Sequence, residues 1–163
     1  MTSRWRQCLL GIPVAAALCL ATLITVSAPP ASAAGCSGNL VGHHPVRNAA
    51  GELLAHVDIY YDSSTGYNCA RLNSYDGWWG RRKWMYIELY TCRETTDPGD
   101  SCTQYGSGSR YFDNDGGDFQ YYAGPVSVYG RGHCIGWNAL SWKQPSSGSA
   151  AGNAQENGAG HCG

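Results

Sequence analysis

Cysteine is the residue type that most constrains this 163-residue chain, because six of its eight cysteines lie beyond an apolar N-terminal segment. An even number of cysteines in an exported chain predicts disulfides, here three. Cys92 and Cys102 flank a turn-rich loop, so we expect them to pair. The other four cysteines allow three connectivities. We favour the pairing of Cys36 with Cys69 and of Cys134 with Cys162.

Residues 1–33 have the features of a cleaved signal peptide. Two arginines precede an uncharged apolar stretch over 9–26, and Ala31-Ser32-Ala33 forms a small-x-small cleavage site. An uncleaved anchor is an alternative, although the stretch is at the lower limit for spanning a bilayer. Lipidation of Cys36 is another, although the large aliphatic residue expected three places before it is missing. We expect an extracellular protein that has left the membrane after cleavage.

Removal of residues 1–33 leaves 130 residues, the usual size of one domain. We expect a β domain over 34–144 and a Gly/Ser-rich flexible tail over 145–163 that Cys162 tethers to the body. The mature chain carries nine bases and twelve acids, a net charge of −3. This charge argues against nucleic acid or an anionic membrane as the main partner.

Apolar residues alternate with period two, which predicts strands. Leu53–Tyr61 and Tyr67–Asn73 flank a turn-forming segment, Asp62–Gly66, and so predict a hairpin. Trp84–Cys92 alternates in the same way, with Met85, Ile87 and Leu89 on one face.

Further short strands are expected after the loop Arg93–Ser101. They are Cys102–Tyr105, Gly108–Phe112, Phe119–Ala123, Val126–Tyr129 and His133–Asn138, with turns at Asp113–Gly117 and Gly124-Pro125. Because proline cannot donate to a ladder, Pro125 should lie at a strand start, a bulge or an edge. The pattern predicts an all-β fold, a small disulfide-braced antiparallel sandwich or barrel of seven to nine strands.

No catalytic or metal-binding motif in the sequence has all of its required residues. The chain lacks Gly-x-Ser-x-Gly, and His43-His44-Pro45 is typical of a solvated turn. Asp113, Asp115 and Asp118 depart from a calcium loop at two required places, which favours a β-turn. We therefore expect no active site, no cofactor, no metal and no cluster of three histidine or carboxylate ligands.

Aromatic residues supply the one candidate binding surface. Trp78 and Trp79 are adjacent, and Arg81 and Arg82 follow them closely. Flat rings on a β protein can stack on sugar rings, and the neighbouring bases could contact an anionic wall polymer. The alternative is that these rings fill the core of a chain poor in Leu and Phe. We expect at least one of the two indoles to be exposed.

Several segments resemble the spore-associated protein A family of streptomycetes. They are Asp62–Cys69, Tyr122–Val128, Gly132–Trp137 and the closing Cys162-Gly163. The resemblance implies a small exported protein found with spores or the cell surface, without known catalytic residues. The chain departs from the family at Cys92 and Cys102, at 78–83 and in its tail.

The expected function is that of a non-enzymatic secreted protein of the spore or cell surface, with cell-wall polymer or spore-surface components as partners. One alternative is a carbohydrate- or wall-binding module that uses Trp78, Trp79, Arg81 and Arg82. Another is a protease inhibitor that presents the loop Arg93–Ser101, which the flanking cysteines would brace.

Overall fold

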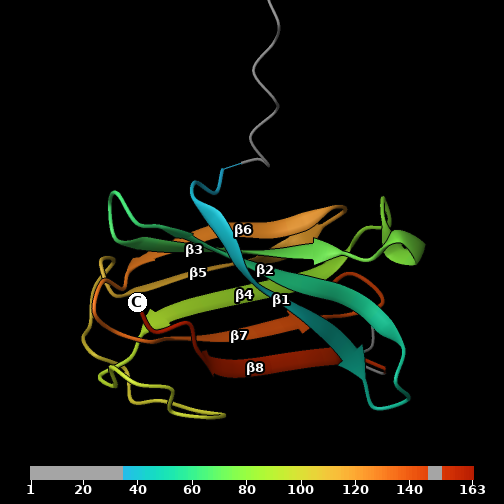
Figure 1. Ribbon diagram of the computed structural model, residues 1–163. Coiled ribbons are helices and arrows are strands. Elements are labelled where there is room, and N and C mark those ends of the chain that lie inside the picture. Colours follow the sequence, from blue (N-terminus) through green and yellow to red (C-terminus); the bar gives the residue numbers. More distant parts are fainter. Residues whose placement is uncertain (1–34, 147–151) are drawn as a thin grey trace, which may run out of the picture.

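The computed structural model describes residues 35–146 and 152–163, so the expected signal peptide lies outside the described residues. The described part of the chain forms eight antiparallel strands in the order β5-β4-β7-β8-β1-β2-β3-β6 (Figure 1). The strands are β1 (Asn39–Asn48), β2 (Leu53–Asp62), β3 (Tyr67–Ser74), β4 (Lys83–Thr91), β5 (Phe112–Phe119), β6 (Tyr122–Tyr129), β7 (Ile135–Ser141) and β8 (Ala154–Gly160).

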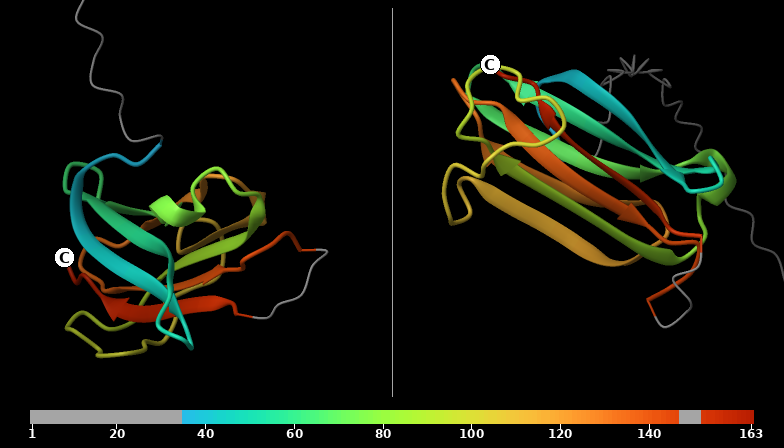
Figure 2. Two further views of the ribbon diagram at one scale, coloured as in Figure 1. Left: turned by 90° about the vertical axis from the view of Figure 1, so that its right-hand side faces the viewer. Right: turned by 90° about the horizontal axis from the view of Figure 1, so that it is seen from below.

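The sheet curls around one apolar interior and forms a nearly closed barrel (Figure 2). The predicted alternation is confirmed, because Val57 and Ile59 of β2 and Met85, Ile87 and Leu89 of β4 are fully buried. The expected antiparallel, disulfide-braced all-β fold is therefore confirmed, in its barrel form. No helix in the two described ranges is long and apolar enough to cross a membrane.

Three disulfides brace the described residues, and all three match the expected pairing. Cys36 bonds to Cys69, Cys92 to Cys102 and Cys134 to Cys162. The first ties the N-terminal end of the described chain to β3. The last ties the end of the chain to the segment that leads into β7.

Side chains, rather than a backbone ladder, join β5 to β6. We call this contact the β5/β6 seam. Asp115 Oδ2 accepts a hydrogen bond from the Gly124 amide at 2.7 Å, and Asp113 Oδ2 accepts one from the Ser127 amide at 2.8 Å. The predicted turn at Asp113–Gly117 is wrong. Its residues lie in the middle of β5, because the ladder with β4 offsets their weak strand propensity.

The β1/β8 seam is the second place where the ladder is incomplete. Arg47 and Asn48 of β1 pair with Gln155 and Ala154 of β8, and the two strands diverge beyond that point (Figure 1). Further along, His44 Nε2 lies 3.2 Å from His161 Nε2, and the His44 ring centre lies 4.4 Å from that of Trp137.

The predicted solvated turn at His43-His44-Pro45 is therefore wrong. The segment lies in β1 and pairs with β2, and His44 is directed towards Trp137. Gly42 makes room for this arrangement, because a Cβ there would lie 2.7 Å from His161 Nε2 and 2.8 Å from His44 Nε2.

Glycines directly opposite aromatic residues allow rings to lie close to the sheet. Gly116 pairs with Tyr86, Gly136 with Tyr90 and Gly158 with Trp137. A Cβ on these glycines would approach the facing ring to 2.9, 2.4 and 2.4 Å, respectively. Glycine in these strands thus serves packing, although its local propensity disfavours a strand.

The predicted flexible tail is wrong for Ala154–Gly160, which forms β8 between β7 and β1. Its tether through Cys162 is confirmed. The predicted return strand Cys102–Tyr105 is reduced to one bridge between Cys92 and Gln104, and the strand expected at Gly108–Phe112 begins only at Phe112.

The expected break at Gly124-Pro125 is absent, since β6 runs through it. Of the expected strand Phe119–Ala123, Phe119 ends β5, residues 120–121 connect the two strands, and the rest begins β6. The pairing of β6 with β3 shifts register opposite Gly124-Pro125, between Ala70 and Leu72. Pro125 thus lies at an irregularity in the ladder, one of the positions expected for it.

Candidate functional site

The segment between β3 and β4 carries the predicted binding residues, and a buried lysine holds it in place. Lys83 is fully buried, and its ammonium donates to the carbonyl oxygens of Trp78 at 3.0 Å and of Arg81 at 3.2 Å. Burial, together with the charge of Arg81, lowers the pKa of Lys83 to about 8. These bonds fix the short 3-10 turn Asp76–Trp78 and the residues after it.

Trp78 and Trp79 have different environments. Trp78 packs against the core, and the Arg81 guanidinium lies 5.2 Å from the centre of its ring. Trp79 is 54% exposed, and its ring centre lies 5.0 Å from that of Tyr121, which is 44% exposed. The prediction that at least one indole is exposed is confirmed, and Trp79 is the ring that a ligand can reach.

A surface hollow of about 380 Å³ lies beside this pair of rings. Its walls include Arg82, Asp118, Gln120, Tyr121 and Tyr122. The Asp118 carboxylate accepts hydrogen bonds from the Ser146 amide at 2.7 Å and from the Ser146 hydroxyl at 3.2 Å. The hollow combines aromatic faces with a cation, a carboxylate and an amide, groups that can stack on a sugar ring and bind its hydroxyls.

More aromatic rings lie on β4 and beside it. Trp84 pairs with Asp118 across the β4–β5 ladder. The ring of Trp84 is nearly parallel to that of Tyr86, at 7° and 5.9 Å between centres, and lies 5.1 Å from that of Trp142. Trp84, Tyr86 and Trp142 thus form a group of half-buried rings, and Trp84 stands next to Asp118 of the hollow.

A hydrogen-bonded carboxylate orders one end of this group of rings. The Tyr86 hydroxyl donates to Glu88 Oε2 at 2.6 Å, and the Asn138 amide donates to Glu88 Oε1 at 3.1 Å. Burial and the Glu88 carboxylate raise the pKa of Tyr86 to about 12, so the phenol stays neutral. The surface offers polar groups of fixed orientation beside its rings.

Sequence reasoning found part of this site. Trp79 and Arg82 lie at the hollow or beside it, whereas Trp78 and Arg81 are engaged with one another. Tyr121 and Asp118 were missed, because they reach the hollow through the register of β5 on β4. The sequence carries no local signal for that register.

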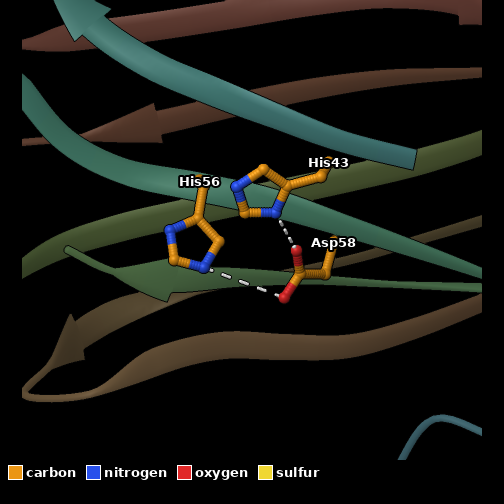
Figure 3. Close-up of side chains that lie close together, drawn as sticks. All are labelled: His43, His56 and Asp58. Carbon is orange, nitrogen blue, oxygen red and sulfur yellow. Dashed lines mark hydrogen bonds and ion pairs between the residues drawn. The ribbon is translucent and has the colours of Figure 1, made fainter. Parts of the chain in front are cut away.

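A second group of side chains converges on the outer face of β1 and β2, and Figure 3 shows His43, His56 and Asp58 directed towards one another. Each offers one ligand atom, and these atoms all lie within 4.8 Å of one another. The prediction that no cluster of three histidine or carboxylate ligands exists is therefore wrong. Local pattern placed His56 and Asp58 on one face, but it assigned His43 to a turn.

Cys92, Glu94 and Cys102 also lie close together, but this group is no thiolate metal site, because the two cysteines form a disulfide. The same bond braces the loop Arg93–Ser101. Glu94 adds to the bracing, since its carboxylate accepts a hydrogen bond from the Thr103 amide at 3.1 Å.

Comparisons with protein-family models, with curated proteins and with solved structures found no match to this chain. The resemblance to the spore-associated family therefore stays a prediction from the sequence.

Proposed function

We propose that this protein is a secreted, non-enzymatic protein of the cell or spore surface that binds cell-wall glycan through the hollow beside Trp79 and Tyr121. The observation that carries the proposal is the exposed pair of rings, 5.0 Å apart, at a hollow that contains Arg82, Asp118 and Gln120. Exposed aromatic residues beside oriented polar groups suit a ligand with apolar ring faces and many hydroxyls.

The bracing of the site supports a binding role. Lys83 fixes the backbone at Trp78 and Arg81, and the Gly80 amide donates to the Gln120 carbonyl at 3.0 Å. The loop that bears Trp79 is thus attached to the turn that bears Tyr121. A site whose parts are held in place loses little conformational entropy when a ligand binds.

Binding to insoluble peptidoglycan, chitin and cellulose tests the proposal. We expect the protein to sediment with one of these polymers, and a variant with Trp79→Ala and Tyr121→Ala to bind about tenfold more weakly, a loss of about 1.4 kcal/mol. Both side chains are substantially exposed, so the thermal stability of the variant should stay close to that of the parent.

Tyr105→Ala is the matched control, because Tyr105 is 43% exposed and lies outside the hollow. It should leave binding unchanged. Wild-type binding to none of the polymers, or an equal loss in the control, would contradict the proposed site.

Surface location is a separate part of the proposal. Three disulfides suit an oxidising compartment outside the cytosol. The resemblance to a spore-associated family supports the spore surface in particular. Proteomics of washed spores against culture supernatant tests this part, with enrichment on spores as the expected result.

Protease inhibition is the second candidate, because the loop Arg93–Ser101 is largely exposed and closed by a disulfide. Incubation with trypsin and subtilisin tests it. Stoichiometric inhibition that is lost on substitution of Arg93 would favour this function over glycan binding.

A further inference from the structure

The cluster on β1 and β2 results from strand geometry. His56 and Asp58 are two residues apart on β2 and so point to the same side of the sheet. His43 of β1 stands directly opposite Asp58 in the ladder. The three side chains therefore belong to one patch on the outside of the barrel, apart from the aromatic residues that line the hollow.

The distances between the polar atoms suit a metal ion with little rearrangement. His43 Nδ1 lies 2.7 Å from Asp58 Oδ1, and His56 Nε2 lies 3.8 Å from Asp58 Oδ2. Tetrahedral Zn²⁺ with bonds of about 2.0–2.1 Å places its ligand atoms about 3.3 Å apart. Shifts of about half an ångström would bring these two distances to that value, and the ligand atoms of His43 and His56 lie within 4.8 Å of one another. His43 can supply the shift at its own contact with Asp58, because its side chain is 59% exposed.

A supporting hydrogen bond holds the carboxylate in position. The Asn73 amide donates to Asp58 Oδ2 at 2.8 Å, and the Asp58 side chain is only 13% exposed. Groups that orient a metal ligand from behind in this way are a general feature of metal sites.

The residues that face the cluster do not favour covalent catalysis by a nucleophilic side chain. A His–Asp dyad that serves covalent catalysis needs a side-chain nucleophile within reach. The positions opposite His56 are Pro45 and Asn73, and Arg71 stands opposite Asp58 on β3. None of these three side chains is a nucleophile.

We propose that His43, His56 and Asp58 bind a divalent transition-metal ion, with Zn²⁺ as the type case and with remaining positions open to water or to another ligand. Two imidazoles and one carboxylate suit Zn²⁺, Cu²⁺ or Ni²⁺, whereas Ca²⁺ and Mg²⁺ take oxygen ligands. Arg71 stands opposite Asp58 on β3, and its positive charge lowers the affinity of the site for cations in general. This site does not depend on glycan binding.

Calorimetric titration of the purified protein with ZnCl₂ at pH 7.5 tests the proposal. We expect one Zn²⁺ per chain, and affinity at least about tenfold lower in both His43→Gln and His56→Gln. His133→Gln is the matched control, because His133 lies outside the cluster and packs against Tyr105. CaCl₂ should give no binding heat.

Asp58→Asn could impair folding because its carboxylate is buried, so the exposed His43→Gln variant is the decisive one. A second measurement is the visible spectrum of the Co²⁺-loaded protein, which should show nitrogen and oxygen coordination without thiolate bands. Absence of Zn²⁺ binding at millimolar concentration would overturn the proposal. Retention of full affinity in His43→Gln and His56→Gln, or an equal loss in His133→Gln, would do the same.

Discussion

The barrel is closed in two different ways at the two places where its ladder is incomplete. At the β5/β6 seam, Asp113 and Asp115 accept hydrogen bonds from backbone amides of β6. At the β1/β8 seam, one short stretch of ladder is followed by the contact of His44 with His161 and Trp137, and the disulfide Cys134–Cys162 lies at the chain end.

The comparison shows that a strand edge without a full ladder can be closed by residues that are near in the sequence or by residues that are distant. The β5/β6 seam joins strands that are consecutive in the chain, and its carboxylates lie 9 and 14 residues from the amides that they bind. The β1/β8 seam joins the two ends of the described chain, since His44 and His161 are 117 residues apart. A contact between distant residues has the larger loop-closure entropy to overcome. Here the disulfide Cys134–Cys162 holds the end of β8 beside β7, the strand that bears Trp137.

Removal of the Cys134–Cys162 bond should have the largest effect. The double variant Cys134→Ser, Cys162→Ser opens a link between residues 28 apart, and the chain-entropy model gives a loss of about 3–4 kcal/mol in the free energy of unfolding. Urea denaturation measures this loss in the free energy of unfolding. As a control, Cys92→Ser with Cys102→Ser opens a link of only 10 residues and should cost about 1 kcal/mol less. Equal losses would contradict the expected dependence on the length of the closed loop.

Removal of a carboxylate from the β5/β6 seam should have an intermediate effect. Asp115→Ala leaves the Gly124 amide without its acceptor, at a cost of about 1–3 kcal/mol. Asp115→Asn keeps an oxygen acceptor and should lose less. Hydrogen exchange of the Gly124 amide should speed up in the alanine variant, and unchanged protection would show that the carboxylate does not close this seam.

Acidification should weaken the β1/β8 seam by the smallest amount. Burial lowers the pKa of His44 and of His161, with the charge of His161 adding to the shift at His44. The unfolded chain therefore binds more protons than the folded chain below about pH 6.5, and stability falls as the pH drops through this value. The urea midpoint should decrease from pH 7.5 to 5.5.

The variant His44→Phe should reduce the slope of the urea midpoint against pH without removing it, because burial also lowers the pKa of His56. Glu156, whose pKa is raised by burial, acts in the opposite direction at the acid end of the range. The slope is therefore compared between variants. An identical slope in His44→Phe would exclude His44 as a source of the pH dependence.

Local pattern predicted the parts of the fold whose residues alternate. The β2–β3 hairpin and β4 follow from period two, and the pairing of Cys92 with Cys102 follows from the turn between them. Strands β5 and β8 were missed, because their glycines, asparagines and acids favour turns locally. Strand β1 was missed too, because His43-His44-Pro45 is typical of a turn. Pairing with neighbouring strands decides their conformation, and that information is distant in the sequence.

The candidate sites also divide into features that follow from local pattern and features that depend on strand pairing. Exposure of one indole followed from the adjacency of Trp78 and Trp79 between two glycines. The approach of Tyr121 to Trp79 and of His43 to Asp58 depends on contacts between different strands. Single-strand periodicity identifies which residues share a face, and strand register determines which of them meet.

The glycines that face aromatic rings have a consequence for how this sequence can vary. Gly116 and Tyr86, Gly136 and Tyr90, and Gly158 and Trp137 are each a direct cross-strand pair in which one member is large and the other has no side chain. Enlargement of the glycine alone would force the ring away. The two positions of each pair should therefore covary among relatives, with the ring and the glycine able to exchange strands.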